Sequence, residues 1–259
     1  MQLRHRLPIL SLLACLSLST AGVARGETLV IAADLWCPIN CAADSPKPGI
    51  FVELARDIFA EAGIQVRYET RNWARVLQEV RRGDINAAIG AGYDDAPDFL
   101  FGETPVALSR NCFYTLQDSS WRYVGVESLP AVRIGVINDY SYGEPINGYI
   151  AGPHAQGDRV QVAAGNKALD LNLTKLRHGR LDAVLENSWV IQSRLAELGL
   201  SGELREAGCR EPDMPIFLAF SPARADSGRY VDLFEQGLRR YRADGRLQAL
   251  LGRYGVSER

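Results

Sequence analysis

Trp36 and Trp73 are the side chains of this chain best placed to hold a small solute. Each follows a predicted strand, at 28–33 and at 64–68 respectively. Large aromatic residues often belong to a core. Turns at the carboxyl edge of an open α/β sheet are, however, where such sheets bind ligands. We therefore expect both tryptophans to line a ligand site.

Polar and aromatic side chains occupy corresponding turns farther along the chain. Tyr93 stands beside Asp94 and Asp95, and two acidic groups near a cleft favour a cationic or hydroxyl-rich ligand. Glu186 and Asn187 end a later strand, where the alternative is that the asparagine only caps the next helix. The expected ligand contacts are Trp36, Trp73, Gly90, Tyr93, Tyr140, Ser141, Tyr142, Glu186 and Asn187.

No catalytic residue, cofactor site or metal site is expected. The sequence has no HExxH motif, no phosphate-binding loop and no Ser-His-Asp or Cys-His set. His154 and His178 lie far in sequence from any cysteine pair, so no spacing fits zinc. An enzyme stays open as an alternative: Glu186, with a pKa raised by burial, would be the general acid of a dehydratase or lyase acting on a small carboxylic acid.

The elements that position these residues alternate between strand and helix, the rhythm of an α/β sheet. The order Gly, polar, apolar, polar, Ala occurs after a helix at both 83–87 and 179–183, which predicts two similar lobes. Two chain crossings between the lobes would create a hinge and a cleft. The predicted strands are 28–33, 64–68, 85–90, 131–137, 161–164, 180–185 and 216–220, and the predicted helices are 50–62, 74–82, 168–179, 188–199, 226–243 and 245–253.

Residues 1–26 are typical of a cleaved secretory signal peptide. Arg4 and Arg6 precede an apolar run from Leu7 to Leu18 that is followed by small residues. The alternatives are a membrane anchor, for which the run is short, and lipidation at Cys15. Within the mature chain we expect one lobe from residues 27–112 plus 220–259, and a second lobe from residues 113–219.

The charge balance constrains the partners. The whole chain has 29 basic and 31 acidic side chains. Removing residues 1–26 takes away Arg4, Arg6 and Arg25 and leaves a net charge of −5. This balance argues against nucleic acid or an anionic membrane as a partner.

Four cysteines remain after the signal peptide, namely Cys37, Cys41, Cys112 and Cys209. An even number in an exported protein favours two disulfides. Cys37 and Cys41 are close enough in sequence to pair locally, which would leave the other two to close a long loop. A redox role for the first pair is an alternative, although its spacing is not that of a CxxC motif.

Taken in order, the motifs resemble those of type II periplasmic solute-binding proteins, in the polar amino-acid branch (bacterial extracellular solute-binding proteins, family 3). The resemblance covers essentially the whole mature chain. It implies a two-lobe α/β fold with a hinge and a ligand cleft between the lobes. The motifs are Leu29-Val-Ile-Ala-Ala-Asp34, Pro48-Gly-Ile-Phe-Val-Glu-Leu-Ala55, Trp73, Gly83-Asp-Ile-Asn-Ala-Ala88, Val132-Arg-Ile-Gly-Val136 and Gly179-Arg-Leu-Asp-Ala-Val184.

The resemblance also assigns roles to single positions. It implies that Trp36 and Trp73 form aromatic walls, and that a helix N-terminus at 139–143 offers N–H groups to an anion. Two positions depart from the family pattern. The loop 91–98 lacks the arginine that usually binds the ligand carboxylate, and Asn187 replaces an aspartate that holds the ligand ammonium.

The function implied is capture of a small polar solute in the periplasm by lobe closure. The expected partners are a small-molecule ligand and an inner-membrane permease of an ABC-type transporter, with the binding protein itself a monomer. A ligand sensor on the same scaffold is an alternative to a transport protein, alongside the enzyme described above.

The cysteine assignment predicts that the mature, natively folded protein has no thiol that reacts with an alkylating reagent, because all four sulfurs are in disulfides. Mass spectrometry after alkylation, with and without prior reduction, checks this prediction. Labelling of Cys37 or Cys41 without reduction would contradict it.

Overall fold

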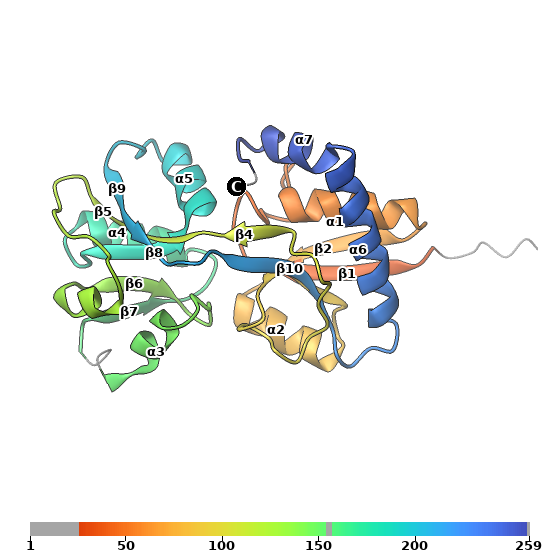
Figure 1. Cartoon of the computed structure of the whole chain (residues 1–259), viewed down its shortest axis with the longest axis horizontal. Helices are drawn as coiled ribbons and strands as arrows, with labels where there is room; N and C mark the ends of the chain where they lie inside the picture. Colours follow the sequence, from red (N-terminus) through yellow and green to blue (C-terminus); the bar gives the residue numbers. More distant parts are fainter. Residues whose placement is uncertain (1–25, 154–156, 258–259) are drawn as a thin grey trace, which may run out of the picture.

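The computed structural model describes residues 26–153 and 157–257. Cys15, His154 and all of the expected signal peptide except Gly26 lie outside the described residues. Within these residues the chain forms two five-stranded sheets, each with helices packed on its faces. Extended segments run between the two lobes (Figure 1). The expected two-lobe α/β architecture is confirmed.

The first sheet has the strand order β2-β1-β3-β10-β4, in which β2, β1 and β3 are parallel and β10 pairs antiparallel with both β3 and β4. Helices α1, α6 and α7 lie on one side of this sheet and α2 on the other (Figure 1). The elements are β1 (Thr28–Ala33), α1 (Ile50–Glu61), β2 (Gln65–Thr70), α2 (Trp73–Arg82), β3 (Ala87–Ala91), β4 (Ala107–Ser109), β10 (Met214–Phe220), α6 (Ser227–Ala243) and α7 (Arg246–Arg253).

The second sheet repeats this plan in the order β7-β6-β8-β5-β9, in which β7, β6 and β8 are parallel and β5 pairs antiparallel with both β8 and β9. Helices α4 and α5 cover one side, and α3 covers the other. The elements are β5 (Asn111–Leu116), the 3₁₀ helix η1 (Val126–Ala131), β6 (Ile134–Ile137), α3 (Ile146–Ala151), β7 (Val160–Ala163), α4 (Ala168–Arg177), β8 (Ala183–Asn187), α5 (Ser188–Glu197) and β9 (Leu204–Cys209).

The chain passes between the sheets at Arg110, and again between Cys209 and Met214. The expected lobe boundaries differ from these positions. Asn111 and Cys112, expected in the first lobe, belong to the second sheet. Residues 214–219 of β10, expected in the second lobe, belong to the first sheet. At Arg110 the chain stays extended through the crossing, so no turn marks where the pairing partner changes. The second crossing bends at Glu211 and Pro212, before β10 and not near its end as expected.

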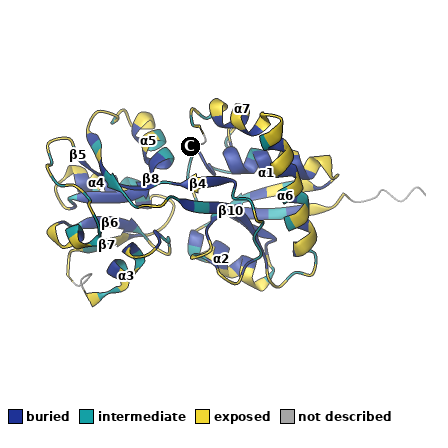
Figure 2. Cartoon of the chain, in the orientation of Figure 1, coloured by how far each residue is buried: buried dark blue, intermediate teal, exposed yellow. Residues whose placement is uncertain are grey.

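The cores of both lobes follow from the sequence pattern. The strands are buried along most of their length, whereas the outer faces of the helices are exposed (Figure 2). In α1 the apolar residues fall on one face and pack against β2, α6 and α7, as a period of 3.6 residues requires. None of the helices in the described part of the chain is long and apolar enough to cross a membrane.

Close packing of α6 on α1 depends on one glycine. A Cβ atom at Gly237 would lie 2.3 Å from Cγ2 of the buried Ile58, far inside van der Waals contact. Gly228 is on the same helix, and a Cβ there would meet nothing within 4 Å.

We therefore expect Gly237→Ala to lower the free energy of unfolding by about 1–3 kcal/mol, because overpacking outweighs the better helix propensity of alanine. Gly228→Ala is the matched control and should leave stability unchanged or raise it by up to about 1 kcal/mol. Chemical denaturation of the two variants measures this difference. Equal stabilities of the two variants would contradict the tight contact.

Candidate functional site

A cleft between the two lobes collects side chains from the carboxyl ends of parallel strands in both sheets. This is the edge at which open α/β sheets bind ligands. The centres of water molecules can occupy about 40 Å³ of it, which is room for a few waters. The cleft is lined by Asp34, Trp36, Trp73, Ile89, Gly90, Gly92, Asp95, Ser109, Asn111, Tyr140, Ser141, Tyr142, Glu186, Met214 and Ile216.

Trp36 is held by the tight loop that follows β1. Its backbone N–H donates to the carbonyl of Asn40 over 2.8 Å, and the side-chain amide of Asn40 donates to the carbonyl of Asp34 over 2.7 Å. Gly90, at φ +82°, lies under the indole: a Cβ there would be 3.3 Å from Cζ3 of Trp36. Glycine is therefore suited to this position both by its positive φ and by the close approach of the ring.

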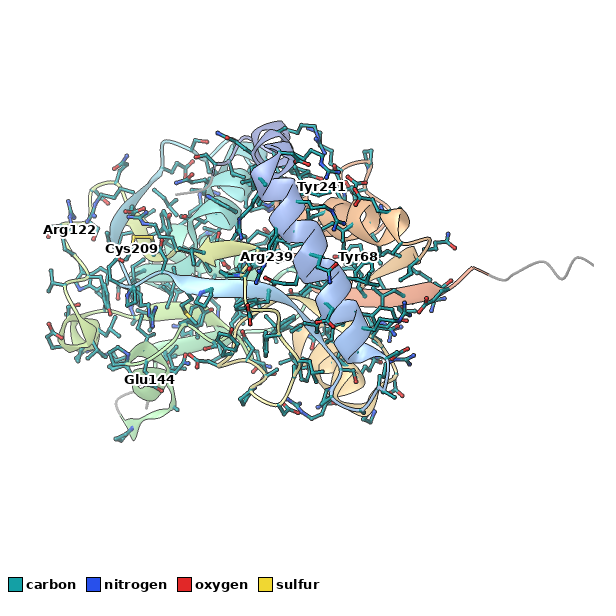
Figure 3. All side chains as sticks on the ribbon, turned by 45° about the vertical axis from the view of Figure 1, so that its right-hand side comes forward. Tyr68, Arg122, Glu144, Cys209, Arg239 and Tyr241 are labelled. Carbon is teal, nitrogen blue, oxygen red and sulfur yellow. A yellow bond between two sulfur atoms is a disulfide. The ribbon has the colours of Figure 1, made fainter. Side chains whose placement is uncertain are left out.

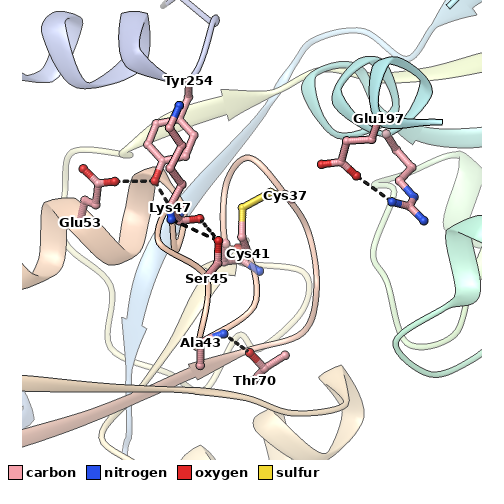
Figure 4. Close-up of a disulfide and its surroundings, with 12 residues drawn as sticks. Cys37, Cys41, Ala43, Ser45, Lys47, Glu53, Thr70, Glu197 and Tyr254 are labelled. Atoms are coloured by element: carbon pink, nitrogen blue, oxygen red, sulfur yellow. Dashed lines mark hydrogen bonds and ion pairs between the residues drawn. A yellow bond between two sulfur atoms is a disulfide. The ribbon is translucent and has the colours of Figure 1, made fainter. Parts of the chain in front are cut away.

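The same loop is fastened to the body of the first lobe beyond Trp36 (Figure 4). A disulfide joins Cys37 to Cys41, and the hydroxyl of Tyr68 on β2 donates to the Cys41 carbonyl over 2.9 Å. Farther on, the N–H of Ala43 donates to Oγ1 of Thr70 over 2.9 Å. The indole is thus presented from an anchored loop.

Asp95 follows β3 and connects the two lobes. Its Oδ2 accepts the N–H of Gly92 over 2.7 Å, and its Oδ1 accepts the N–H of Ser141 from the second lobe over 3.3 Å. The turn that contains Ser141 is ordered internally, because Asn147 Oδ1 accepts the N–H of Tyr142 and Ser141 Oγ accepts the N–H of Gly143. The N–H groups of this turn therefore already have acceptors.

Helix α3 begins at Ile146 and has only six residues. The resemblance implied a helix N-terminus at 139–143 that offers N–H groups to an anion. The segment is instead a turn, and the N–H groups of Ser141, Tyr142 and Gly143 already donate to side chains of Asp95, Asn147 and Ser141.

Two further hydrogen bonds cross the cleft. Trp36 Nε1 donates to Glu186 Oε1 over 2.8 Å, and the Tyr140 hydroxyl donates to Asp34 Oδ2 over 2.5 Å. The rings of Trp36 and Tyr140 meet edge to face with centroids 6.3 Å apart. First-lobe and second-lobe residues therefore contact each other directly at the centre of the site.

The three carboxyl groups of the cleft share an electrostatic environment that favours their neutral forms. Burial raises the pKa of Glu186 to about 7, against the hydrogen bonds from Trp36 and from the Asn187 N–H, which lower it. Desolvation between the cleft walls raises the pKa of Asp34 to about 6, although the Tyr140 hydroxyl lowers it. Burial likewise raises the pKa of Asp95 to about 6. Desolvation is the common cause.

Seven of the nine expected ligand contacts line the cleft, and two do not. Tyr93 is about half exposed, at 48%, and packs against Phe101 and Phe217 with ring centroids 4.7 and 4.9 Å away. Asn187 caps α5, since its Oδ1 accepts the N–H groups of Trp189 and Val190. Its amide donates to Ser109 Oγ over 2.9 Å. The capping alternative therefore describes Asn187.

Other lining residues were not among the expected contacts. Asp34 and Asp95 are acids that follow β1 and β3, and this position in the sequence could have added them to the expected contacts. Ile89 lies in β3 and Gly92 follows it. The remaining lining residues come from the strands next to the chain crossings, namely Ser109, Asn111, Met214 and Ile216.

One group of metal-type ligands comes together among the described residues, namely Cys112, Glu206 and Cys209. Its two sulfurs form a disulfide between β5 and β9 in the second lobe (Figure 3), so neither is a thiolate. Glu206 is held by both terminal nitrogens of Arg110, at 2.6 and 2.8 Å. Arg110 itself is outside the cleft lining and cannot serve there as the missing carboxylate-binding arginine.

The fold and cleft define a two-lobed binding protein, and comparison with known families gives its class. A family model of bacterial extracellular solute-binding proteins, family 3, matches residues 29–257. The chain belongs to this family, as the sequence resemblance indicated. Comparison with curated proteins found no match.

Solved structures share the fold at low sequence identity. A histidine kinase sensor domain with similarity to periplasmic binding proteins has a TM-score of 0.73 and 20% identity, covering 91% of this chain and 99% of that chain. An ancestral arginine-binding protein bound to arginine has a TM-score of 0.71 and 16% identity, covering 88% of this chain and 98% of that chain. An amino acid ABC transporter substrate-binding protein of Streptococcus pneumoniae bound to L-arginine has a TM-score of 0.69 and 19% identity, covering 88% of this chain and 94% of that chain.

The raised pKa of Glu186 predicts a pH-dependent contribution to stability. The folded state holds this proton up to about pH 7, whereas an unfolded glutamate releases it near its ordinary value of 4.5. The stabilisation is therefore complete below pH 4.5 and is lost as pH rises towards and through 7. Glu186→Gln stays neutral and offers the same oxygen to Trp36.

We expect the variant to gain about 3 kcal/mol relative to the wild type between pH 4 and pH 8. Urea denaturation of both proteins across this range measures the difference, and the value at pH 4 is the internal reference. A difference that stays constant with pH would contradict the assignment.

Proposed function

We propose that this chain is a periplasmic solute-binding protein that captures a small polar solute by closure of its two lobes. The observation that carries this proposal is the cleft itself, in which Trp36 and Asp34 of one lobe bond directly to Glu186 and Tyr140 of the other. A solute that bonds to both sets of side chains favours the closed arrangement by its differential affinity.

The dimensions of the cleft support a mechanism with a moving hinge. Room for a few waters does not admit a solute the size of an amino acid unless the lobes separate. Two crossings, at Arg110 and between Cys209 and Met214, connect the lobes. A few residues at such positions can take up the backbone rotation of a hinge.

Delivery to an inner-membrane ABC permease is the proposed destination of the solute. Membership of the family supports it, as does the likeness to a structure described as an ABC transporter substrate-binding protein. A sensory role is the second candidate, and the likeness to a histidine kinase sensor domain favours it. We propose a secreted, monomeric protein in either case.

An enzyme on this scaffold has one observation in its favour. Glu186 is 1% exposed and its pKa is raised to about 7, the range in which a carboxylic acid can transfer protons near neutral pH. Binding and catalysis separate experimentally, because a binding protein returns its ligand unchanged. Recovery of each bound compound by mass spectrometry after overnight incubation makes that distinction.

The proposal predicts that at least one solute from a panel of amino acids, polyamines, organic acids and small sugars stabilises the mature protein. A ligand at a hundred times its dissociation constant adds about 2.7 kcal/mol to the free energy of unfolding, which a thermal melt detects. Small-angle X-ray scattering should show that the same solute makes the protein more compact. Absence of a shift with every compound would count against a solute-binding role.

Matched variants place the bound solute in the cleft. Trp36→Phe keeps an aromatic ring but removes the N–H that donates to Glu186, and should weaken solute binding about tenfold. Tyr93→Phe, outside the cleft, is its control and should bind like the wild type. Equal affinities of the two variants would place the binding site elsewhere.

A further inference from the structure

We propose that the solute held in this cleft is an organic cation without a carboxylate group, such as an amine or a guanidine, bound through Glu186 and Asp34. The inference rests on the proposed function and names the chemical class of the ligand. It separates this chain from a binder of ordinary zwitterionic amino acids.

The charge of the cleft is one-sided. Asp34, Asp95 and Glu186 are the ionisable acids in its lining, and no lysine, arginine or histidine of the described residues joins them. A bound cation would restore the ionised forms of these acids, because an opposite charge nearby offsets the desolvation that now opposes ionisation. A bound carboxylate would face the same three acids and be repelled.

One acceptor of the cleft is still free. Glu186 Oε1 accepts from Trp36 Nε1 and from the Asn187 N–H, both over 2.8 Å. Glu186 Oε2 is buried in a residue that is 1% exposed, and it has no hydrogen-bond partner within the described chain. A buried acceptor without a partner is costly, and an N–H group of an ammonium or guanidinium would satisfy it with a charge-assisted bond.

The backbone N–H groups of the turn at 141–143 and the guanidinium of Arg110, which could hold a ligand carboxylate, are engaged elsewhere. The N–H of Ser141 donates to Asp95, that of Tyr142 to Asn147, and that of Gly143 to Ser141 Oγ. Arg110 is occupied by Glu206. The guanidinium of Arg210 lies against Gly143. Its Nη1 donates to the Pro212 carbonyl and its Nε has no partner among the described residues, but the side chain does not line the cleft.

The aromatic walls suit the same ligand. Trp36, Trp73, Tyr140 and Tyr142 all line the cleft. Ring faces attract cations, most strongly in a desolvated site. Aromatic rings and carboxylates together therefore favour a cation with an apolar body.

Three pairs of compounds that differ only by the carboxylate test the inference: L-arginine with agmatine, L-lysine with cadaverine, and L-ornithine with putrescine. Isothermal titration calorimetry of the mature protein gives the affinities. We expect the member without the carboxylate to bind at least about tenfold more tightly in at least one pair, since it avoids an uncompensated buried charge. An amino acid that binds as tightly as its partner in every pair would overturn the inference.

Variants connect that preference to the named side chains. Glu186→Gln should weaken binding of the preferred cation at least about tenfold, because a charge-assisted bond becomes a neutral one. Asp34→Asn is the second variant and should act in the same direction. Glu197→Gln changes an exposed acid of α5 that is paired with Arg194 (Figure 4), and should bind like the wild type. Unchanged affinity in both cleft variants would overturn the assignment.

The outcomes also distinguish the inference from the proposed function. Binding of an organic acid, a sugar or a neutral solute, with none of the six test compounds bound, would overturn the cationic class while a solute-binding role stands. Failure of every compound in the broader panel would remove both.

Discussion

Three of the hydrogen bonds between the lobes end on carboxyl groups that line one cleft. Glu186 accepts from Trp36, Asp34 from Tyr140 and Asp95 from the N–H of Ser141. Each acid is partly or fully desolvated, so a donor from the opposite lobe replaces water that the closed arrangement excludes. The relative position of the lobes and the chemistry of the site therefore depend on the same three side chains.

The proposed ligand class follows from differences at a few positions of the family fold. The sheets, the helices that cover them and the two chain crossings keep the family plan, and they bring the strand ends of both lobes together. The ligand is selected by a few turn residues on that plan. Here the loop after β3 supplies Asp95 and lacks the arginine of the family pattern. Asn187 caps α5 instead of presenting an acid to the cleft. The cleft has acidic groups, but it lacks the arginine that usually binds the ligand carboxylate.

Much of the fold could be predicted because its signals are local. The amphipathic pattern of α1, the strand β1 and the repeated Gly-containing turns before β3 and β8 reflect burial of one helix face and of whole strands. The tryptophans and Glu186 could be found for a related reason, since they follow strands at the ligand edge. Tyr93 follows a strand as well, but it packs on Phe101 and Phe217. Strand ends identify a neighbourhood and do not give the direction of a side chain.

The sequence by itself determined an α/β chain with two similar lobes, four cysteines beyond residue 26, and acids and aromatics after the strands, because periodicity and turn residues are properties of neighbours in the chain. Only the tertiary structure decided which of these side chains meet. The pairing of Trp36 with Glu186 spans 150 positions, and the chain changes sheets between β4 and β5 at the single residue Arg110. Such contacts depend on how two separately formed lobes pack together, and no local pattern records that packing.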